Sequence, residues 1–319
     1  MAFDLTGLTA YTDETSQELV KKSILTGRTI DLVKVIPGLK GITQLNILQN
    51  DVVIKPATCG FTTGDGDVTF EGVDITVKPL EVKEELCAKD LETYWMGQMM
   101  KPGAATDVPF QEVIADSYVE KVQKANELNI WQGDLAGAGT GGYENFDGFT
   151  TNVTPAGGAV AVTAAAGPHT TANIIAHVEA MILAIPEDIL DQDDLTFFMS
   201  YEAYNTYTSA LRTANLFHYN GAVGADYTTT IPGTNVKAVA TKGLSGTGTI
   251  SNAITAAKDV FFISNASNMV VGVDMLNEEE KFMMKYDEFE DNVKVNIQWK
   301  MGTQVYFQEF CVINYPDAA

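Results

Sequence analysis

One stretch near the C-terminus constrains the fold of this chain more than any other. Over residues 293–301, Val293, Val295, Ile297, Trp299 and Met301 alternate with polar or charged residues. Successive side chains of a strand point to opposite faces, so this pattern predicts a long β-strand with one buried and one solvated face. Gly302 is then expected to turn the chain into a final strand, residues 305–313. Such a sheet needs a second layer to cover its apolar face.

A long helix that can form this layer is predicted over residues 108–132. Asp107 suits the N-cap, Pro109 suits the first turn, and Gly133 ends the segment. The stripe expected to be buried consists of Phe110, Ile114, Tyr118, Val122 and Ala125, and the opposite, solvated face of Glu112, Asp116, Glu120, Gln123 and Glu127. At ~1.5 Å per residue the helix would be roughly 37 Å long. Its single apolar stripe predicts an amphipathic strut that lies on another layer.

A long hairpin is predicted before this helix. Residues 45–55 are rich in Val, Ile and Leu, and residues 67–80 show strand-like alternation. The alternation changes phase at Glu71 and Gly72, which predicts a bulge that bends the returning strand. The glycine-rich turn between the strands contains Cys59, Gly60, Phe61, Gly64, Asp65 and Gly66. Either the hairpin projects from the subunit, or it belongs to the subunit's own sheet.

The remaining segments alternate between helical and strand patterns, so the fold class is α+β. A helix over residues 171–185 is stopped by Pro186, and Ser200 suits the N-cap of a helix that runs to residue 211. Strands are expected at residues 195–199, 236–240, 260–263 and 269–273. The first 44 residues are interrupted by Gly27, Pro37 and Gly38, which predicts an extended arm ordered by its neighbours.

Composition restricts the classes of partner. Lys plus Arg number 20 and Asp plus Glu number 42, so the formal charge of −22 argues against an electrostatic grip on nucleic acid. The charge either keeps the protein soluble or repels enclosed DNA from an acidic wall. The sequence shows neither a signal peptide nor an apolar run long enough for a membrane span, so a soluble protein without a membrane partner is expected. Cys59, Cys87 and Cys311 are interpreted as reduced thiols.

No catalytic, cofactor-binding or metal-binding residue is predicted. The segment from Gly137 to Gly142 fits the G-x-G-x-x-G pattern of dinucleotide-binding loops, but a helix precedes it where that mechanism needs a strand. Of the histidines His169, His177 and His218, His177 is interpreted as a structural residue on a helix. The carboxylate clusters at residues 187–194 and 287–291 lack the spacing of a calcium loop.

The order of these elements resembles the major capsid proteins of tailed bacteriophages of the Hong Kong 97 type. The similarity includes the helix ended by Pro186, the hydrophobic strand 195–199 and the helix capped by Ser200. It also includes the turn Asn145-Phe-Asp-Gly148 after the long helix. It covers nearly the whole chain and depends on the order and spacing of elements rather than on a diagnostic peptide.

This resemblance implies a division of the chain into four parts. Residues 1–44 would be the N-terminal arm and residues 45–81 an extended loop that lies over a neighbouring subunit. Residues 82–134 and 274–305 would form a peripheral domain with a long spine helix. Residues 135–273 and 306–319 would form an axial domain at the capsomer centre. The turn containing Cys59, Gly60, Phe61, Gly64, Asp65 and Gly66 would then be the tip of the extended loop and make assembly contacts.

The resemblance also implies a function and partners. The subunit would assemble as hexamers and pentamers into an icosahedral head in the host cytoplasm, enclosing double-stranded DNA without binding it specifically. Its expected partners are further copies of itself, a portal and a separate scaffold protein. The alternatives are an encapsulin-type bacterial compartment shell and a soluble nucleotide-binding enzyme that would use residues 137–142.

Overall fold

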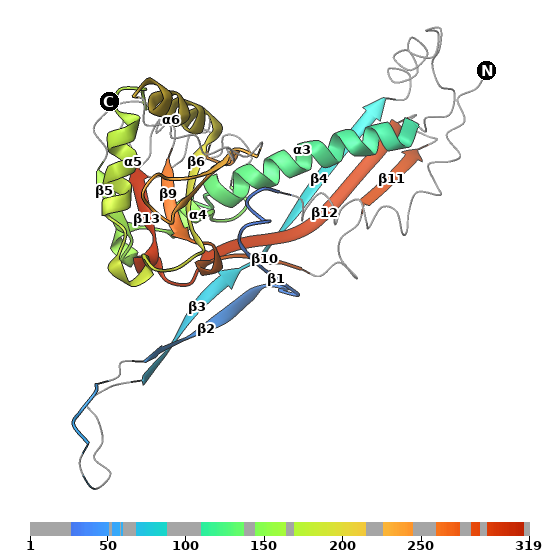
Figure 1. Ribbon diagram of the computed structural model, residues 1–319. Helices are drawn as coiled ribbons and strands as arrows, with labels where there is room; N and C mark the ends of the chain where they lie inside the picture. Colours follow the sequence, from blue (N-terminus) through green and yellow to red (C-terminus); the bar gives the residue numbers. More distant parts are fainter. Residues whose placement is uncertain are drawn as a thin grey trace.

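The computed structural model describes residues 27–50, 53–57, 59, 68–87, 110–136, 144–163, 169–214, 226–244, 260–274, 282–287 and 292–315. Within these ranges the strands form three sheets, and a long helix lies beside the largest strands (Figure 1). The structure is thus of the expected α+β class, with a separate narrow projection formed by two strands.

The elements are as follows. The five-stranded sheet contains β1 (Lys34–Pro37), β10 (Met269–Val273), β12 (Asn292–Val305), β11 (Phe282–Asp287) and β4 (Lys78–Cys87). The six-stranded sheet contains β5 (Val160–Thr163), β13 (Val312–Tyr315), β9 (Phe261–Asn265), β6 (Leu195–Ser200), β8 (Lys237–Thr241) and β7 (Thr228–Thr230). The two-stranded sheet pairs β2 (Ile42–Asn50) with β3 (Val68–Thr76). The helices are α3 (Phe110–Gln132), α4 (Phe149–Asn152), α5 (Ile174–Leu183) and α6 (Tyr201–Thr213).

Strand β12 confirms the alternation expected from the sequence. Its residues from Asn292 to Met301 are buried at every second position, and β4 pairs with it in antiparallel register along this stretch. The expected turn at Gly302 is wrong, because β12 continues through this residue to Val305. A Cβ atom at Gly302 would lie 2.2 Å from the carbonyl oxygen of Thr76. The glycine therefore permits β12 to pass close to the backbone of β3, and no turn is made there.

Helix α3 runs along β4 and β12 of this sheet (Figure 1), and its core residues pack with Val293, Val295 and Ile297. Tyr118 and Val122 are buried as expected, and the Tyr118 hydroxyl donates a hydrogen bond of 2.7 Å to a Glu84 carboxylate oxygen. Burial and the Glu84 carboxylate raise the pKa of Tyr118. Two expectations are wrong, since Ala125 is exposed and Glu127 is buried. The last turns of α3 are enclosed on several sides, so a single apolar stripe no longer describes them.

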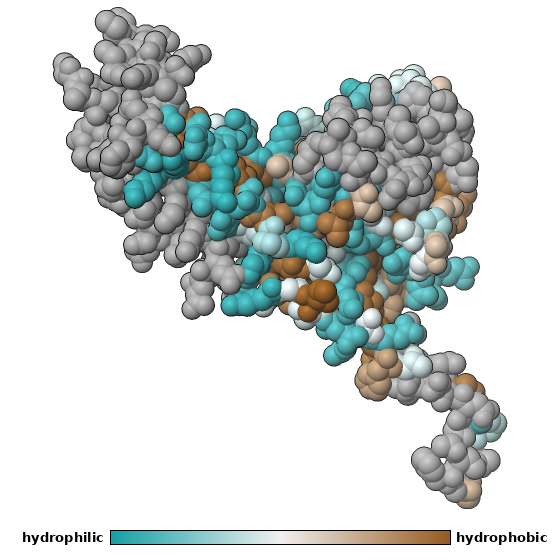
Figure 2. Space-filling view, turned by 180° about the vertical axis from the view of Figure 1, so that it is seen from behind, coloured by the Kyte–Doolittle hydropathy of each residue, from teal (hydrophilic) through white to brown (hydrophobic). Residues whose placement is uncertain are grey.

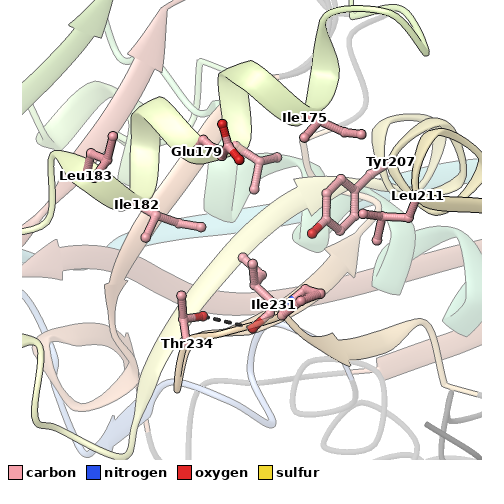
Figure 3. A pocket seen from close by; sticks show the side chains of 10 residues that line it. Ile175, Glu179, Ile182, Leu183, Tyr207, Leu211, Ile231 and Thr234 are labelled. Carbon is pink, nitrogen blue, oxygen red and sulfur yellow. Dashed lines mark hydrogen bonds between the residues drawn. The ribbon is translucent and has the colours of Figure 1, made fainter. Parts of the chain in front are cut away.

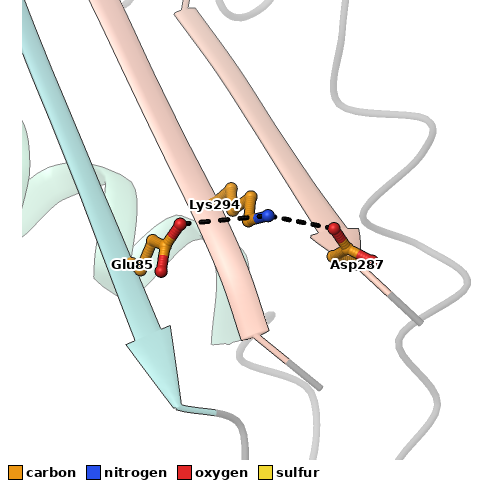
Figure 4. A network of polar contacts seen from close by, with 3 residues as sticks. All are labelled: Glu85, Asp287 and Lys294. Carbon is orange, nitrogen blue, oxygen red and sulfur yellow. Dashed lines mark hydrogen bonds and ion pairs between the residues drawn. The ribbon is translucent and has the colours of Figure 1, made fainter. Parts of the chain in front are cut away.

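The opposite face of the sheet carries charged pairs. The Lys294 ammonium lies 3.0 Å from Asp287 on β11 and 3.8 Å from Glu85 on β4, so it links three strands (Figure 4). These side chains are substantially exposed. In contrast, Lys300 and Asp274 form a pair at 3.1 Å whose side chains are only 18% and 4% exposed.

We expect the two lysines to differ in their effect on stability. Lys294→Met should change the free energy of unfolding by less than about 1 kcal/mol, because water screens an exposed pair. Lys300→Met should cost about 3 kcal/mol, because it leaves the buried Asp274 carboxylate without this cation. Urea unfolding of the two variants checks the order, and equal effects would contradict it.

The six-stranded sheet is covered on both faces, which explains why β6 is buried at every position. Phe197 and Met199 pack toward α5 and α6, whereas Phe198 belongs to the cluster around Trp131 at the end of α3. Ser200 caps α6 as expected, since its hydroxyl accepts a hydrogen bond of 3.0 Å from the amide of Ala203. Pro186 follows α5, as the sequence predicts.

Several segments near the boundaries of the four-part division pair or pack within the subunit as follows. Residues 27–37 pack into the subunit itself, because Ile30 and Val33 join the main core and β1 pairs in parallel with β10. Strand β10 belongs to the five-stranded sheet with β12, and not to the six-stranded sheet. Residues 78–81 begin β4. The projecting part of the hairpin is therefore confined to residues between 42 and 76.

Candidate assembly surface

The hairpin of β2 and β3 projects from the body of the subunit (Figure 1). Its antiparallel register runs without interruption from the pair Ile42 and Thr76 to the pair Asn50 and Val68. The bulge expected at Glu71 and Gly72 is therefore wrong. The Gln44 side chain covers Gly72, where a Cβ atom would lie 2.0 Å from the side-chain nitrogen Nε2 of Gln44. The glycine makes room for this side chain.

One face of the hairpin root is fixed to the subunit. Ile75 is fully buried, and with Val77 it packs against Leu39 and Val270 in a small core of its own. Gln304 on β12 also donates a hydrogen bond of 2.8 Å to the carbonyl oxygen of Asp74. These contacts hold the root rigidly on the five-stranded sheet.

The other face of the hairpin exposes large apolar side chains. Ile42, Leu48 and Phe70 lie on this face, because side chains alternate along each strand and Leu48 is directly opposite Phe70. Their exposed fractions are 74%, 58% and 80%. Figure 2 shows brown and tan residues along this narrow projection, at the lower right. We call Ile42, Leu48 and Phe70 the outer face of the hairpin.

Further out, residues 53–57 and Cys59 are exposed, and Ile54 is 93% exposed. Of the predicted tip residues, only Cys59 is described. Gly60, Phe61, Gly64, Asp65 and Gly66 lie outside the described residues, so their role as assembly contacts stays a prediction. The thiol of Cys59 is free and exposed.

Physical chemistry makes such a projection unfavourable for an isolated chain. A lone two-stranded ribbon is marginally stable in water, and an exposed apolar strand is a site for association with another surface. Burying one Leu or Phe side chain contributes about 1.5–3 kcal/mol. The outer face is therefore the described surface with the clearest reason to be covered by another molecule.

A cavity of about 490 Å³ lies between α5, α6 and the segment after β7 (Figure 3). Its lining is mostly aliphatic, with the Tyr207 and Thr234 hydroxyls and the Glu179 carboxylate as polar groups. Burial raises the pKa of Tyr207 to about 12, so its hydroxyl stays protonated at neutral pH. None of the ten lining residues is a Ser, Cys, Lys or His. The Thr234 hydroxyl donates a hydrogen bond of 3.0 Å to the carbonyl oxygen of Ile231.

The histidines His169 and His177 form a pair that is not part of the cavity lining. His177 is buried and its Nδ1 lies 2.9 Å from Nδ1 of His169, whose ring stacks on Phe261 at 4.1 Å. Burial lowers the pKa of His177. The described residues contain no group of three or more His, Cys, Asp or Glu that could hold a metal ion. Across the described residues, no helix combines the length and the apolar character needed to span a membrane.

Residues 137–142, the candidate dinucleotide loop, lie outside the described residues. Helix α3 precedes this region, and residues 133–136 form no strand. The helix that follows, α4, has only four residues. A phosphate-binding loop needs a strand before it and a helix N-terminus after it, so the surrounding structure does not fit this mechanism.

Comparison with solved structures identifies the class of fold. One similar chain comes from the satellite phage P4 procapsid, a particle that includes the size determination protein. It superposes with a TM-score of 0.61 at 11% identity, and the match covers 96% of this chain and 92% of that chain. A chain from the capsid of an empty GTA particle gives a TM-score of 0.58 at 12% identity, covering 93% of this chain and 90% of that chain. A chain of Gordonia phage Cozz gives a TM-score of 0.57 at 12% identity, covering 92% of this chain and 87% of that chain.

Neither a protein-family model nor a curated protein matches the sequence. The structural similarity therefore shows the fold, which this chain shares with chains of the P4 procapsid and the GTA capsid. It is specifically the Hong Kong 97-type fold that the order of elements predicts, with α3 as the long helix and β2–β3 as the projecting hairpin.

Proposed function

We propose that this chain is the major capsid protein of a tailed bacteriophage and assembles as hexamers and pentamers into an icosahedral head around double-stranded DNA. The observation that carries the proposal is the projecting hairpin, whose root is fixed to the subunit and whose outer face is apolar and exposed. A monomeric protein gains nothing from this arrangement, whereas a shell subunit can bury the outer face against a neighbour.

Further support comes from the fold and the charge. The similar structures come from a phage procapsid, the capsid of a GTA particle and a Gordonia phage, which favours a capsid over an encapsulin-type compartment. The net charge of −22 suits a wall that encloses DNA without holding it. A portal and a separate scaffold protein are the expected partners in this role, with assembly in the host cytoplasm. No catalytic role is part of this proposal.

The four-part division belongs to this proposal in a modified form. Residues 1–26 would be the arm, the hairpin between residues 42 and 76 the extended loop, and the tip around Cys59 a contact with a neighbouring subunit. The five-stranded sheet with α3 would form the peripheral domain, and the six-stranded sheet with α5 and α6 the axial domain.

The outer face can be tested by substitution. The double variant Leu48→Ser and Phe70→Ser should raise the protein concentration needed for assembly by at least about tenfold, because two apolar side chains no longer gain by burial. Its melting temperature should stay close to that of the wild type, since both side chains are exposed in the subunit. Sedimentation velocity over a concentration series measures assembly.

Leu190→Ser is the matched control, because Leu190 is also exposed but lies after α5, away from the hairpin. The control should assemble at the wild-type concentration. Normal assembly of the double variant would overturn the assignment of the outer face as an intersubunit contact.

A further inference from the structure

The C-terminal end of α3 holds a buried carboxyl group that the shell function does not use. Glu127 is 6% exposed, and one of its carboxylate oxygens, Oε1, accepts hydrogen bonds from the hydroxyl and the amide of Thr29, the latter at 3.3 Å. The other oxygen, Oε2, is buried without a hydrogen-bond partner and lies against Gly27. A lone buried carboxylate oxygen is costly when charged.

Thr29 connects this carboxyl group to the main core. Its hydroxyl oxygen accepts a hydrogen bond of 2.7 Å from the indole nitrogen of Trp131, which is fully buried. The Thr29 carbonyl in turn accepts hydrogen bonds of 3.1 Å from the amides of Leu32 and Val33. Residues 27–33 therefore form a compact turn. Thr29 itself is fully buried. The hydrogen bonds of Thr29 thus hold this turn on α3.

Residues 27–33 also reach the six-stranded sheet. The Arg28 guanidinium donates hydrogen bonds to Thr228 at 2.8 Å, to the Tyr201 hydroxyl at 3.3 Å and to the Asp226 carbonyl. The turn therefore lies between α3 on one side and β7 and α6 on the other. Because residues 27–33 directly follow residues 1–26 in the sequence, we call them the root of the N-terminal segment.

The charged groups around Glu127 come from this turn. Arg28 attracts the carboxylate and Asp31 repels it, while the other groups packed on it, from Thr29, Trp131 and Gly243, carry no charge. Lys242, next to Gly243, is exposed. Desolvation by burial is the largest influence and raises the pKa of Glu127, with Asp31 adding to the rise and the Thr29 hydrogen bonds and Arg28 opposing it.

We propose that Glu127, Thr29 and Trp131 form a protonation-dependent latch that holds the root of the N-terminal segment on the subunit when Glu127 is neutral and loosens it when Glu127 ionises. The direction follows from linkage. A carboxyl group with a raised pKa in the folded state contributes stability that is full below its unfolded-state pKa and is lost as the pH rises through its folded-state value. Docking of residues 27–33 therefore weakens with rising pH.

Hydrogen–deuterium exchange of the full-length chain tests this latch, with each rate divided by its intrinsic value at the same pH. Protection of the Thr29, Asp31 and Val33 amides should fall with rising pH, by up to about tenfold per pH unit, because one proton is involved. In Glu127→Gln this dependence should vanish, because the amide keeps an oxygen for Thr29 and cannot ionise. Glu120→Gln, an exposed position on the same helix, should behave as the wild type.

Protection that does not change with pH in the wild type, or changes equally in Glu127→Gln, would overturn the latch. If Glu127→Gln does not fold, the wild type can be titrated by ¹³C NMR of the glutamate side-chain carboxyl groups. The latch requires one resonance with a midpoint above the ordinary glutamate range, and its absence would also overturn the proposal. The junction lies within one chain, so these results do not depend on shell assembly.

Discussion

A subunit whose hairpin is shortened should fold normally and form no shells. Replacing residues 50–68 by Asn-Gly connects Gln49 to Thr69 through a two-residue turn, and these two residues already face each other in the register. The root contacts of Ile75 and Val77 remain in place. We expect the melting temperature to stay within about 2 °C of the wild type, because the described residues 53–57 and Cys59 are exposed.

Assembly should be lost in the same protein, because the proposed contacts at the tip are gone. Circular dichroism melting and sedimentation velocity measure the two properties on one sample. A protein that fails to fold would show that the segment belongs to the subunit's own sheet. A protein that still forms shells would show that the tip, including Cys59, makes no essential contact.

The second large effect concerns Trp131, where α4, the six-stranded sheet and residues 27–33 meet. Its ring contacts Phe149, Phe198 and Phe262 with centroid distances of 5.5, 4.9 and 5.5 Å, and its indole nitrogen bonds to Thr29. Trp131→Ala should cost about 3–5 kcal/mol through the cavity it leaves. That is a large share of the ~5–15 kcal/mol that stabilises a typical folded protein.

Two further variants separate the causes of this loss. Trp131→Phe keeps an aromatic ring but removes the hydrogen bond to Thr29, and should cost about 1–2 kcal/mol. Leu190→Ala, at an exposed position, should stay within about 0.5 kcal/mol of the wild type. Guanidinium unfolding gives all three values. A Trp131→Ala variant as stable as the Leu190→Ala control would contradict the central packing role.

Strands and helices with one regular periodicity could be predicted from the sequence. The alternation of β12 and the fourfold spacing that buries Tyr118 and Val122 reflect a sheet and a helix that each have one covered face. The N-cap at Ser200 is local as well, since its partner Ala203 is three residues away.

Features that depend on distant segments could not be predicted. Glu127 fits the charged face of α3 by spacing, but residues 27–33 cover it and make it a buried group. By sequence, Gly72 suggests a bulge and Gly302 suggests a turn. In the structure, Gly72 makes room for the Gln44 side chain and Gly302 for the Thr76 carbonyl. Such close approaches are set by tertiary packing, which local sequence does not encode.

The candidate assembly surface was predicted in part. The apolar strands of the hairpin indicate its existence, but periodicity alone cannot tell a projecting ribbon from an internal one. Which face is exposed follows only from the register that places Leu48 opposite Phe70 and from the burial of Ile75 on the other face.

The most direct test of the shell function is negative-stain electron microscopy of the purified full-length protein, alone and after co-expression with scaffold proteins of tailed phages. We expect closed particles of uniform size, with image averages that show sixfold and fivefold capsomers. A protein that remains monomeric at high concentration in both preparations would contradict it.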